Sequence, residues 1–163
     1  MTRGQERQID VPRLFWDSSA LIAAIMSPTE DSPGRLLLKL GAAGACDMRV
    51  SREVLSACER IVRRRNPAMV ARLAVLLDRA NMATTPGPAP QTVALCLEMT
   101  GYEPDARVLA AAVECGAALF LTYDAEHFLQ NPLIGPPDNR VRVATPHVAL
   151  QWVRERLAKL CDG

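Results

Sequence analysis

Residues 13–25 read RLFWDSSALIAAI, and this stretch decides the fold because a strand and a helix meet inside it. The residues before Asp17 form a largely apolar, strand-like run, and the residues after it are helix-like. The same arrangement returns at residues 118–124, ALFLTYD, where a second apolar strand leads into Asp124. Ligands of an open α/β sheet bind at the carboxyl ends of its strands. The two aspartates therefore predict a site at that edge of a sheet.

Length and charge bound the class of the protein. The chain has 163 residues, which suits one domain, since a chain of about 150 residues buries about 70% of its unfolded surface. We expect residues 1–11 to form a flexible N-terminal segment and residues 12–160 to form the domain. The formal net charge is +1. No whole-molecule field therefore marks a nucleic-acid or membrane binder, and any attraction of a substrate must be local.

Cysteine usage and the lack of long apolar runs indicate a soluble, cytoplasmic protein. The cysteines are odd in number and scattered, without the close pairs of zinc sites or disulfide scaffolds. They are Cys46, Cys58, Cys96, Cys115 and Cys161. We expect reduced thiols that serve mostly in packing. Residues 1–12 contain no signal-peptide core, and no run approaches the roughly 20 apolar residues of a spanning helix.

Strands alternate with helices along the whole chain. Besides the two strands already described, strands are expected at about residues 48–50 and 141–143. Helices are expected at residues 18–25, 34–40, 52–65, 67–80, 92–99, 104–115 and 146–157, and the proline-rich residues 84–90 and 131–139 are expected to be irregular. Such alternation implies an α/β fold with a mainly parallel sheet and right-handed crossovers.

Asp105 is a third acid of interest, at the second position of the helix expected to begin with Pro104. A helix amino terminus favours a negative charge, so this aspartate also has a purely structural interpretation. Asp17 and Asp124 have one as well, because each could cap the helix or turn that follows it. Together the three carboxylates predict an oxygen-rich site suited to Mg²⁺ or Mn²⁺. Such a cation could activate water and stabilise charge developing on a phosphodiester.

Other polar side chains near these acids are candidates for substrate contacts. The chain has only two histidines, which argues against a histidine-based zinc site. His127 either contacts substrate or is a surface residue of a turn. Arg60 and Arg63 belong to a basic run that suits phosphate contacts, although cations at the carboxyl end of a helix also oppose its dipole favourably. Ser18 and Thr122 are expected to support the site by hydrogen bonding.

Five short stretches resemble the PIN-domain family, metal-dependent nucleases that include the toxins of bacterial toxin and antitoxin pairs. The stretches are FWDSSALI at residues 15–22, VSREVL at 50–55, DARVLAAA at 105–112, LTYDAEHFL at 121–129 and VATP at 143–146. Each is short, but their order and spacing together are fairly specific and span roughly residues 12–155. The resemblance implies a three-layer α/β/α sandwich with a mainly parallel sheet of about five strands.

The function implied by the resemblance is that of a divalent-metal-dependent ribonuclease, with Mg²⁺ or Mn²⁺ as the cofactor. Asp17, Asp105 and Asp124 occupy acid positions of the family and would hold the metal and act in catalysis. The implied partners are RNA, an antitoxin protein and a second copy of the chain. No membrane partner is expected.

Residue 57 departs from the family's pattern. Counting from Ser51, the family's metal-site glutamate falls on Ala57. Glu59 lies about 200° further around the helix, at about 100° per residue, and should face away. Glu53 lies one turn before Ala57 on nearly the same face, and it either reaches the site or leaves it short of one acid. The alternative to a ribonuclease is therefore a catalytically impaired PIN-like module that binds RNA or a protein partner.

A phosphoacceptor domain is a further alternative, because it also has an aspartate after a strand. A phosphatase of that kind would have a second aspartate two residues after Asp17, where Ser19 stands. A receiver domain would have a lysine after a late strand, and none stands near Asp124 or Val143. The sequence argues against both.

Overall fold

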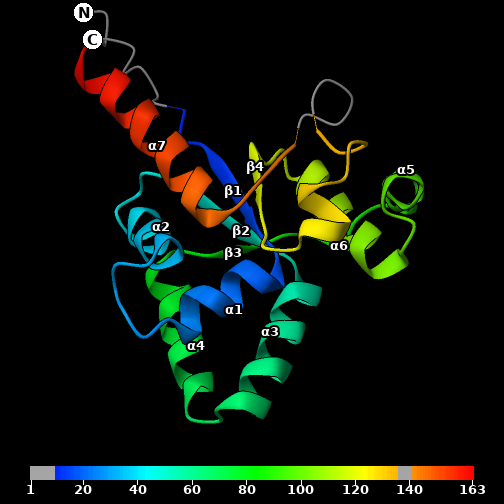
Figure 1. Cartoon of the computed structure of the whole chain (residues 1–163), viewed down its shortest axis with the longest axis horizontal. Coiled ribbons are helices and arrows are strands. Elements are labelled where there is room, and N and C mark those ends of the chain that lie inside the picture. Colours follow the sequence, from blue (N-terminus) through cyan, green and yellow to red (C-terminus); the bar gives the residue numbers. More distant parts are fainter. Residues whose placement is uncertain (1–9, 136–140) are drawn as a thin grey trace, which may run out of the picture.

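Parallel strands form a single five-stranded sheet in the order β3-β2-β1-β4-β5 (Figure 1). The structure is a computed structural model that describes residues 10–135 and 141–163. The strands are β1 (Arg13–Trp16), β2 (Asp47–Val50), β3 (Ala83–Thr84), β4 (Leu119–Leu121) and β5 (Arg142–Ala144). Every neighbouring pair in the sheet is parallel. The prediction of a mainly parallel sheet of about five strands is confirmed.

Helices cover both faces of the sheet. They are α1 (Ser18–Met26), α2 (Pro33–Ala42), α3 (Arg52–Arg65), α4 (Met69–Arg79), α5 (Pro90–Thr100), α6 (Glu103–Glu114) and α7 (Pro146–Cys161), with a short π-helical turn η1 (Ala125–Leu129). Helices α1 to α4 and α7 form one connected layer, whereas α5 and α6 pack against each other on the other side (Figure 1). This arrangement is the expected three-layer α/β/α sandwich.

The central strand β1 anchors the core because both of its faces are covered. Leu14, Phe15 and Trp16 are all 0% exposed, as expected for a strand of a parallel sheet that has helices on both sides. The rings of Phe15 and Phe120, on neighbouring strands, stack with their centroids 5.7 Å apart. The indole Nε1 of Trp16 donates to the sulfur of Met48 at 3.2 Å, so its one polar group is satisfied inside the core.

Side-chain caps fix the start of two helices that follow strands. The hydroxyl of Ser51 accepts from the amide of Val54 at 3.2 Å, as expected for the N-cap of α3. The hydroxyl of Thr145 accepts from the amide of Val148 at 3.4 Å at the start of α7. Such caps satisfy amide groups that have no partner within the helix. They define the points at which α3 begins after β2 and α7 begins after β5.

Two expected element boundaries are wrong because backbone groups find other partners. The second strand was expected to reach Asp124, but β4 ends at Leu121 and the amide of Tyr123 donates to the Ser19 hydroxyl instead. Helix α4 was expected to begin at residue 67, but it begins at Met69. The reason is that Asn66 is the C-cap of α3, where its amide donates to the carbonyl of Val62.

Further differences lie around α5 and α6. The expected irregular residues 84–90 begin in strand β3 and end at the first residue of α5, because Pro90 occupies a first-turn position of that helix. Helix α6 begins at Glu103 rather than at Pro104, so Asp105 is its third residue. The amide of Ala106 donates to the carbonyl of Tyr102 at 2.9 Å, which makes Tyr102 the N-cap.

The cysteines agree with the expectation of reduced packing residues. All five are free thiols, and Cys46, Cys58 and Cys96 are buried. In residues 10–135 and 141–163, no helix has the length and apolar character needed to cross a membrane. The expected flexible segment at residues 1–11 and the irregular residues 131–139 fall partly on residues 1–9 and 136–140, which lie outside the described residues.

Gly41 lies in α2 where this helix packs closely against β2 and the end of α4. A Cβ at this position would lie 2.7 Å from Cγ of Met48 and 2.8 Å from the backbone oxygen of Ala80. Overpacking costs about 1–3 kcal/mol, against about 1 kcal/mol gained in helix propensity. We expect Gly41→Ala to lower the melting temperature, measured by circular dichroism. Gly87→Ala is the matched control, since nothing lies within 4 Å of a Cβ there, and an equal effect of both changes would contradict this account.

Candidate active site

Asp17 directly follows β1, and hydroxyl groups hold its side chain. The register pairs Trp16 with Leu121 across β1 and β4, which places the next residue of each strand side by side. The buried hydroxyl of Thr122 donates to Oδ2 of Asp17 at 2.7 Å. The hydroxyl of Ser19 donates to the same oxygen at 3.3 Å. The site thus has a carboxylate fixed at the carboxyl ends of two neighbouring strands.

Ser19 is a supporting residue that the sequence analysis did not identify. Its Oγ lies 3.2 Å from Oγ1 of Thr122 and accepts from the amide of Tyr123 at 3.0 Å, in addition to its bond to Asp17. Ser18, which was expected to support the site, makes a backbone hydrogen bond to the carboxylate of Asp17 and also lines the neighbouring pocket. The signal that could have found Ser19 is its place in the first turn of α1, where the side chain can reach back towards the end of the strand.

Burial of Asp17 makes its negative charge costly. The residue is 8% exposed, and this burial raises the pKa of its carboxyl group above the ordinary value. The hydrogen bonds from Thr122, from the backbone of Ser18 and from Ser19 lower this pKa, and the charge of Asp124 adds to the increase. A cation next to Asp17 would therefore be favourable.

Asp124 and Asp105 are brought together through His127. Asp124 caps η1 by accepting from the amide of His127 at 3.0 Å. Its other oxygen, Oδ2, lies 2.9 Å from Nδ1 of the His127 ring. The same Nδ1 lies 3.6 Å from Oδ2 of Asp105, which is beyond hydrogen-bonding distance. The expected cap interpretation of Asp124 is confirmed, and the cap leaves the carboxylate facing Asp105.

Electrostatic effects show that these groups influence one another. Burial raises the pKa of Asp105, His127 opposes the increase, and the charges of Asp124 and Asp17 add to it. The hydrogen bond to Asp124 raises the pKa of His127, and the nearby carboxylates strengthen this shift. Within the part of the chain that the structure describes, Oδ2 of Asp105 is buried and has no hydrogen-bond partner.

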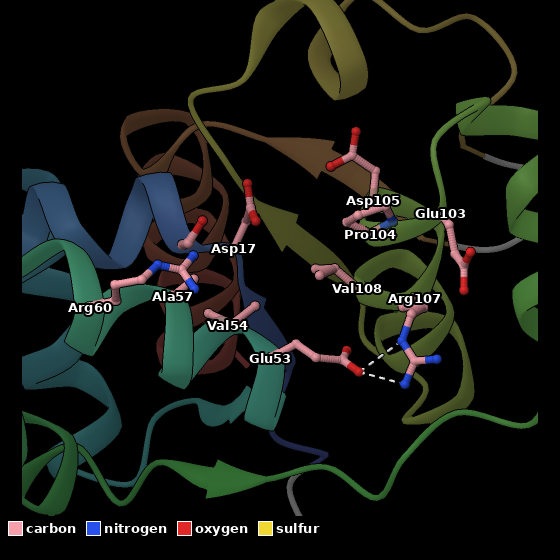
Figure 2. Close-up of a pocket in the computed structure, with 11 residues that line it drawn as sticks. Asp17, Glu53, Val54, Ala57, Arg60, Glu103, Pro104, Asp105, Arg107 and Val108 are labelled. Atoms are coloured by element: carbon pink, nitrogen blue, oxygen red, sulfur yellow. Dashed lines mark hydrogen bonds and ion pairs between the residues drawn. The ribbon is translucent and has the colours of Figure 1, made fainter.

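A pocket of about 400 Å³ lies between the β1–α1 junction, α3 and the start of α6. Asp17 and Asp105 lie on opposite sides of this pocket (Figure 2), which Val54 and Val108 also line. Asp124 and His127 are not among its lining residues. The pocket therefore joins two of the three predicted acids directly, and the third, Asp124, lies outside its lining.

Ala57 and Glu53 both line this pocket, as their positions on one helix face require. The carboxylate of Glu53 points towards Arg107 and away from Asp17 (Figure 2). Nε and Nη2 of Arg107 donate to Oε1 of Glu53 at 2.9 and 2.8 Å. Glu53 therefore lies at the site but is engaged in an ion pair between α3 and α6.

The remaining predicted contacts divide into those in the pocket and those outside it. Arg60 lines the pocket. Arg63 does not line it, because its side chain pairs with Glu59 one turn earlier on the exposed face of α3. Glu103, an acid that the sequence analysis did not consider, also lines the pocket at the start of α6.

The chemistry of these side chains fits a divalent cation. Carboxylate oxygens are the ligands that Mg²⁺ and Mn²⁺ prefer. A cation would offset the mutual repulsion of the acids and could bind Oδ2 of Asp105, which accepts no hydrogen bond from the described part of the chain. Among the described residues, no three histidine, cysteine or acidic side chains are grouped closely enough to hold an ion. The acids would have to move together to bind one.

Comparison with known proteins adds no relative to this picture. No protein-family model matches the chain, and a search of curated proteins returns no significant match.

Asp17→Asn tests the cost of burying this charge. Because the pKa is raised in the folded state, the stability due to protonated Asp17 is fully present below the ordinary pKa of 3.8 and is lost as the pH rises through the folded-state pKa. Asparagine avoids that loss and keeps an oxygen that accepts from Thr122. We expect the variant to melt above the wild type at neutral pH, by a margin that shrinks towards pH 3.8.

Asp31→Asn is the control for this prediction, because Asp31 is exposed in the loop before α2. Asp31→Asn removes the same negative charge from an exposed position, where ionisation carries no cost of burial. Thermal unfolding at several pH values gives the comparison. A margin for Asp17→Asn that is absent at neutral pH, or that grows on acidification, would contradict the account.

Proposed function

We propose that this protein is a PIN-like ribonuclease that hydrolyses phosphodiester bonds of RNA with the help of Mg²⁺ or Mn²⁺. One observation carries the proposal. Asp17, Asp105 and Asp124 come from three separate segments of the chain and lie close enough to interact: burial raises the pKa of Asp105, and the charges of Asp124 and Asp17 raise it further. Clusters of perturbed carboxylates beside a pocket are typical of catalytic sites.

Each acid has a role that its surroundings support. Asp17 is the fixed ligand, since Thr122 and Ser19 hold one of its oxygens. Asp105 supplies a buried oxygen that accepts no hydrogen bond from the described residues. Asp124 orients His127 between itself and Asp105. When bound, a divalent cation would supply Lewis-acid stabilisation of the charge that develops on the phosphate and would lower the pKa of water.

The pocket also supports a phosphate-containing substrate. Arg60 lines it on the Asp17 side (Figure 2), and arginine is a common contact for phosphate oxygens. Its charge would offset the repulsion between the substrate and the acids. Ser18 lines the same pocket, and its hydroxyl is a neutral donor that substrate could use. His127 lies 46% exposed beside the acids, where it can contact substrate.

The resemblance to toxin components extends this proposal to partners and location. A cytoplasmic ribonuclease of this kind would be held inactive by an antitoxin protein that covers the pocket, and a second copy of the chain is the other partner proposed. These proposals rest on the resemblance alone.

A second candidate is a catalytically impaired PIN-like module that binds RNA or a protein partner. Ala57 favours it, because a methyl group lines the pocket where the family has a glutamate. The pairing of Glu53 with Arg107 also favours it, since that pair leaves the pocket with fewer free carboxylates. This module would fold normally and bind RNA without cutting it.

Cleavage of a labelled, structured RNA distinguishes the two candidates. We expect cutting in Mn²⁺ or Mg²⁺, none with chelator, and loss of cutting in Asp17→Asn. The loss should be at least about 100-fold, since even indirect partners of a metal ligand change activity by about 10- to 100-fold. Asp31→Asn, prepared identically, should cut at the wild-type rate. If Asp17→Asn cut RNA at the wild-type rate, the proposal would be overturned. If the wild type and both variants bound RNA but none of them cut it, the impaired module would be supported.

A further inference from the structure

We propose that Glu53 is a fourth acid of this site and that Arg107 is the positioning residue that holds it away from the other acids. The inference rests on the proposed function, because it concerns the same divalent cation. It identifies the side chain that could take the place of a carboxylate at residue 57. It also predicts that the affinity for the cation is limited by an ion pair within the protein.

The space for such a movement is present in the pocket. Glu53 and Ala57 lie one helical turn apart on α3, and both line the pocket together with Asp17. Ala57 has only a methyl group, so no longer side chain stands at that position of the helix face. Figure 2 shows the carboxylate of Glu53 extended towards Arg107. Rotation of its flexible side chain would direct the same carboxylate over Ala57.

The ion pair itself satisfies Glu53 incompletely. Both donors of Arg107 bind one oxygen, Oε1, at 2.9 and 2.8 Å. The other oxygen, Oε2, is buried and has no hydrogen-bond partner among the described residues. The two side chains are 40% and 46% exposed, and ion pairs of this exposure are weakly held. A cation that offers charge to both oxygens can therefore compete with Arg107.

Arg107 has an alternative place to lie when Glu53 leaves it. Arg107 and Glu53 also line a second pocket, of about 760 Å³, beside the carboxyl ends of β2 and β3. Ser51 and Thr85 line that pocket as well, and both follow those strands. The ion pair thus stands between two hollows, so Arg107 can turn into the second one without entering the core.

Binding of Mn²⁺, followed through the electron paramagnetic resonance signal of the free ion, tests this inference without any cleavage assay. We expect Arg107→Met to bind Mn²⁺ about tenfold more tightly than the wild type, in the range by which partners of metal ligands change affinity. Glu53→Gln should remove this gain, so that the double variant binds no more tightly than Glu53→Gln alone. Circular dichroism melts of each variant establish that it is folded.

Arg60→Met is the matched control, because Arg60 lines the same pocket but is not a partner of Glu53 in the described part of the chain. Its removal changes the charge of the pocket without releasing Glu53, so a smaller gain is expected. An unchanged affinity in Arg107→Met, a gain that persists in the double variant, or an equal gain in Arg60→Met would overturn the inference.

Asp17→Asn separates this inference from the proposed function. If Mn²⁺ binding by the wild type depends on Asp17 but Arg107→Met gives no gain, only the role of Arg107 falls. If neither the wild type nor Arg107→Met shows Asp17-dependent binding, the metal site itself is overturned, and the inference falls with it.

Discussion

The parallel pairing of β1 with β4 is the constraint on which the rest of the site depends. Their register sets Trp16 opposite Leu121, so the first residues beyond the two strands, Asp17 and Thr122, meet at the same edge. The resulting hydrogen bond of 2.7 Å fixes the carboxylate in a buried position. Since Leu14, Phe15 and Trp16 of β1 are fully buried and β1 pairs with a strand on each side, this geometry cannot shift without disturbing the core. The site is therefore built at the end of the central strand of the sheet.

At this edge of the sheet, the negative charges that a cation would bind also lower the stability of the folded protein. Burial raises the pKa of both Asp17 and Asp105, which means that the folded protein carries charges that it would be more stable without. His127 offsets part of the repulsion between Asp105 and Asp124. A divalent cation would offset more of it. Retention of costly charges beside a pocket is explained most simply by a ligand that needs them.

The sequence predicts the fold well, because the fold depends on local patterns, and the same patterns place Asp17 and Asp124 after strands. Continuous apolar runs mark the buried strands, and Asp17 and Asp124 follow them closely. The short strand β3 was not predicted, since a strand of two residues carries no periodicity. Ser19 and Arg107 were missed for a different reason. Beyond its local bond to Asp17, Ser19 contacts Thr122 and Tyr123, which lie 103 and 104 positions away. The bond from Arg107 to Glu53 spans 54 positions. These remote contacts are visible only in the tertiary structure.

The central claim is that the acids at the ends of β1 and β4 and at the start of α6 bind one divalent cation. Paramagnetic broadening of backbone amide signals by substoichiometric Mn²⁺ tests it most directly, because broadening falls steeply with distance from the ion. The account predicts that the signals around Asp17, Asp105 and Asp124 weaken first and together. Broadening centred on another acidic side chain, such as exposed Glu30 near α2, or a uniform loss of signal would contradict it.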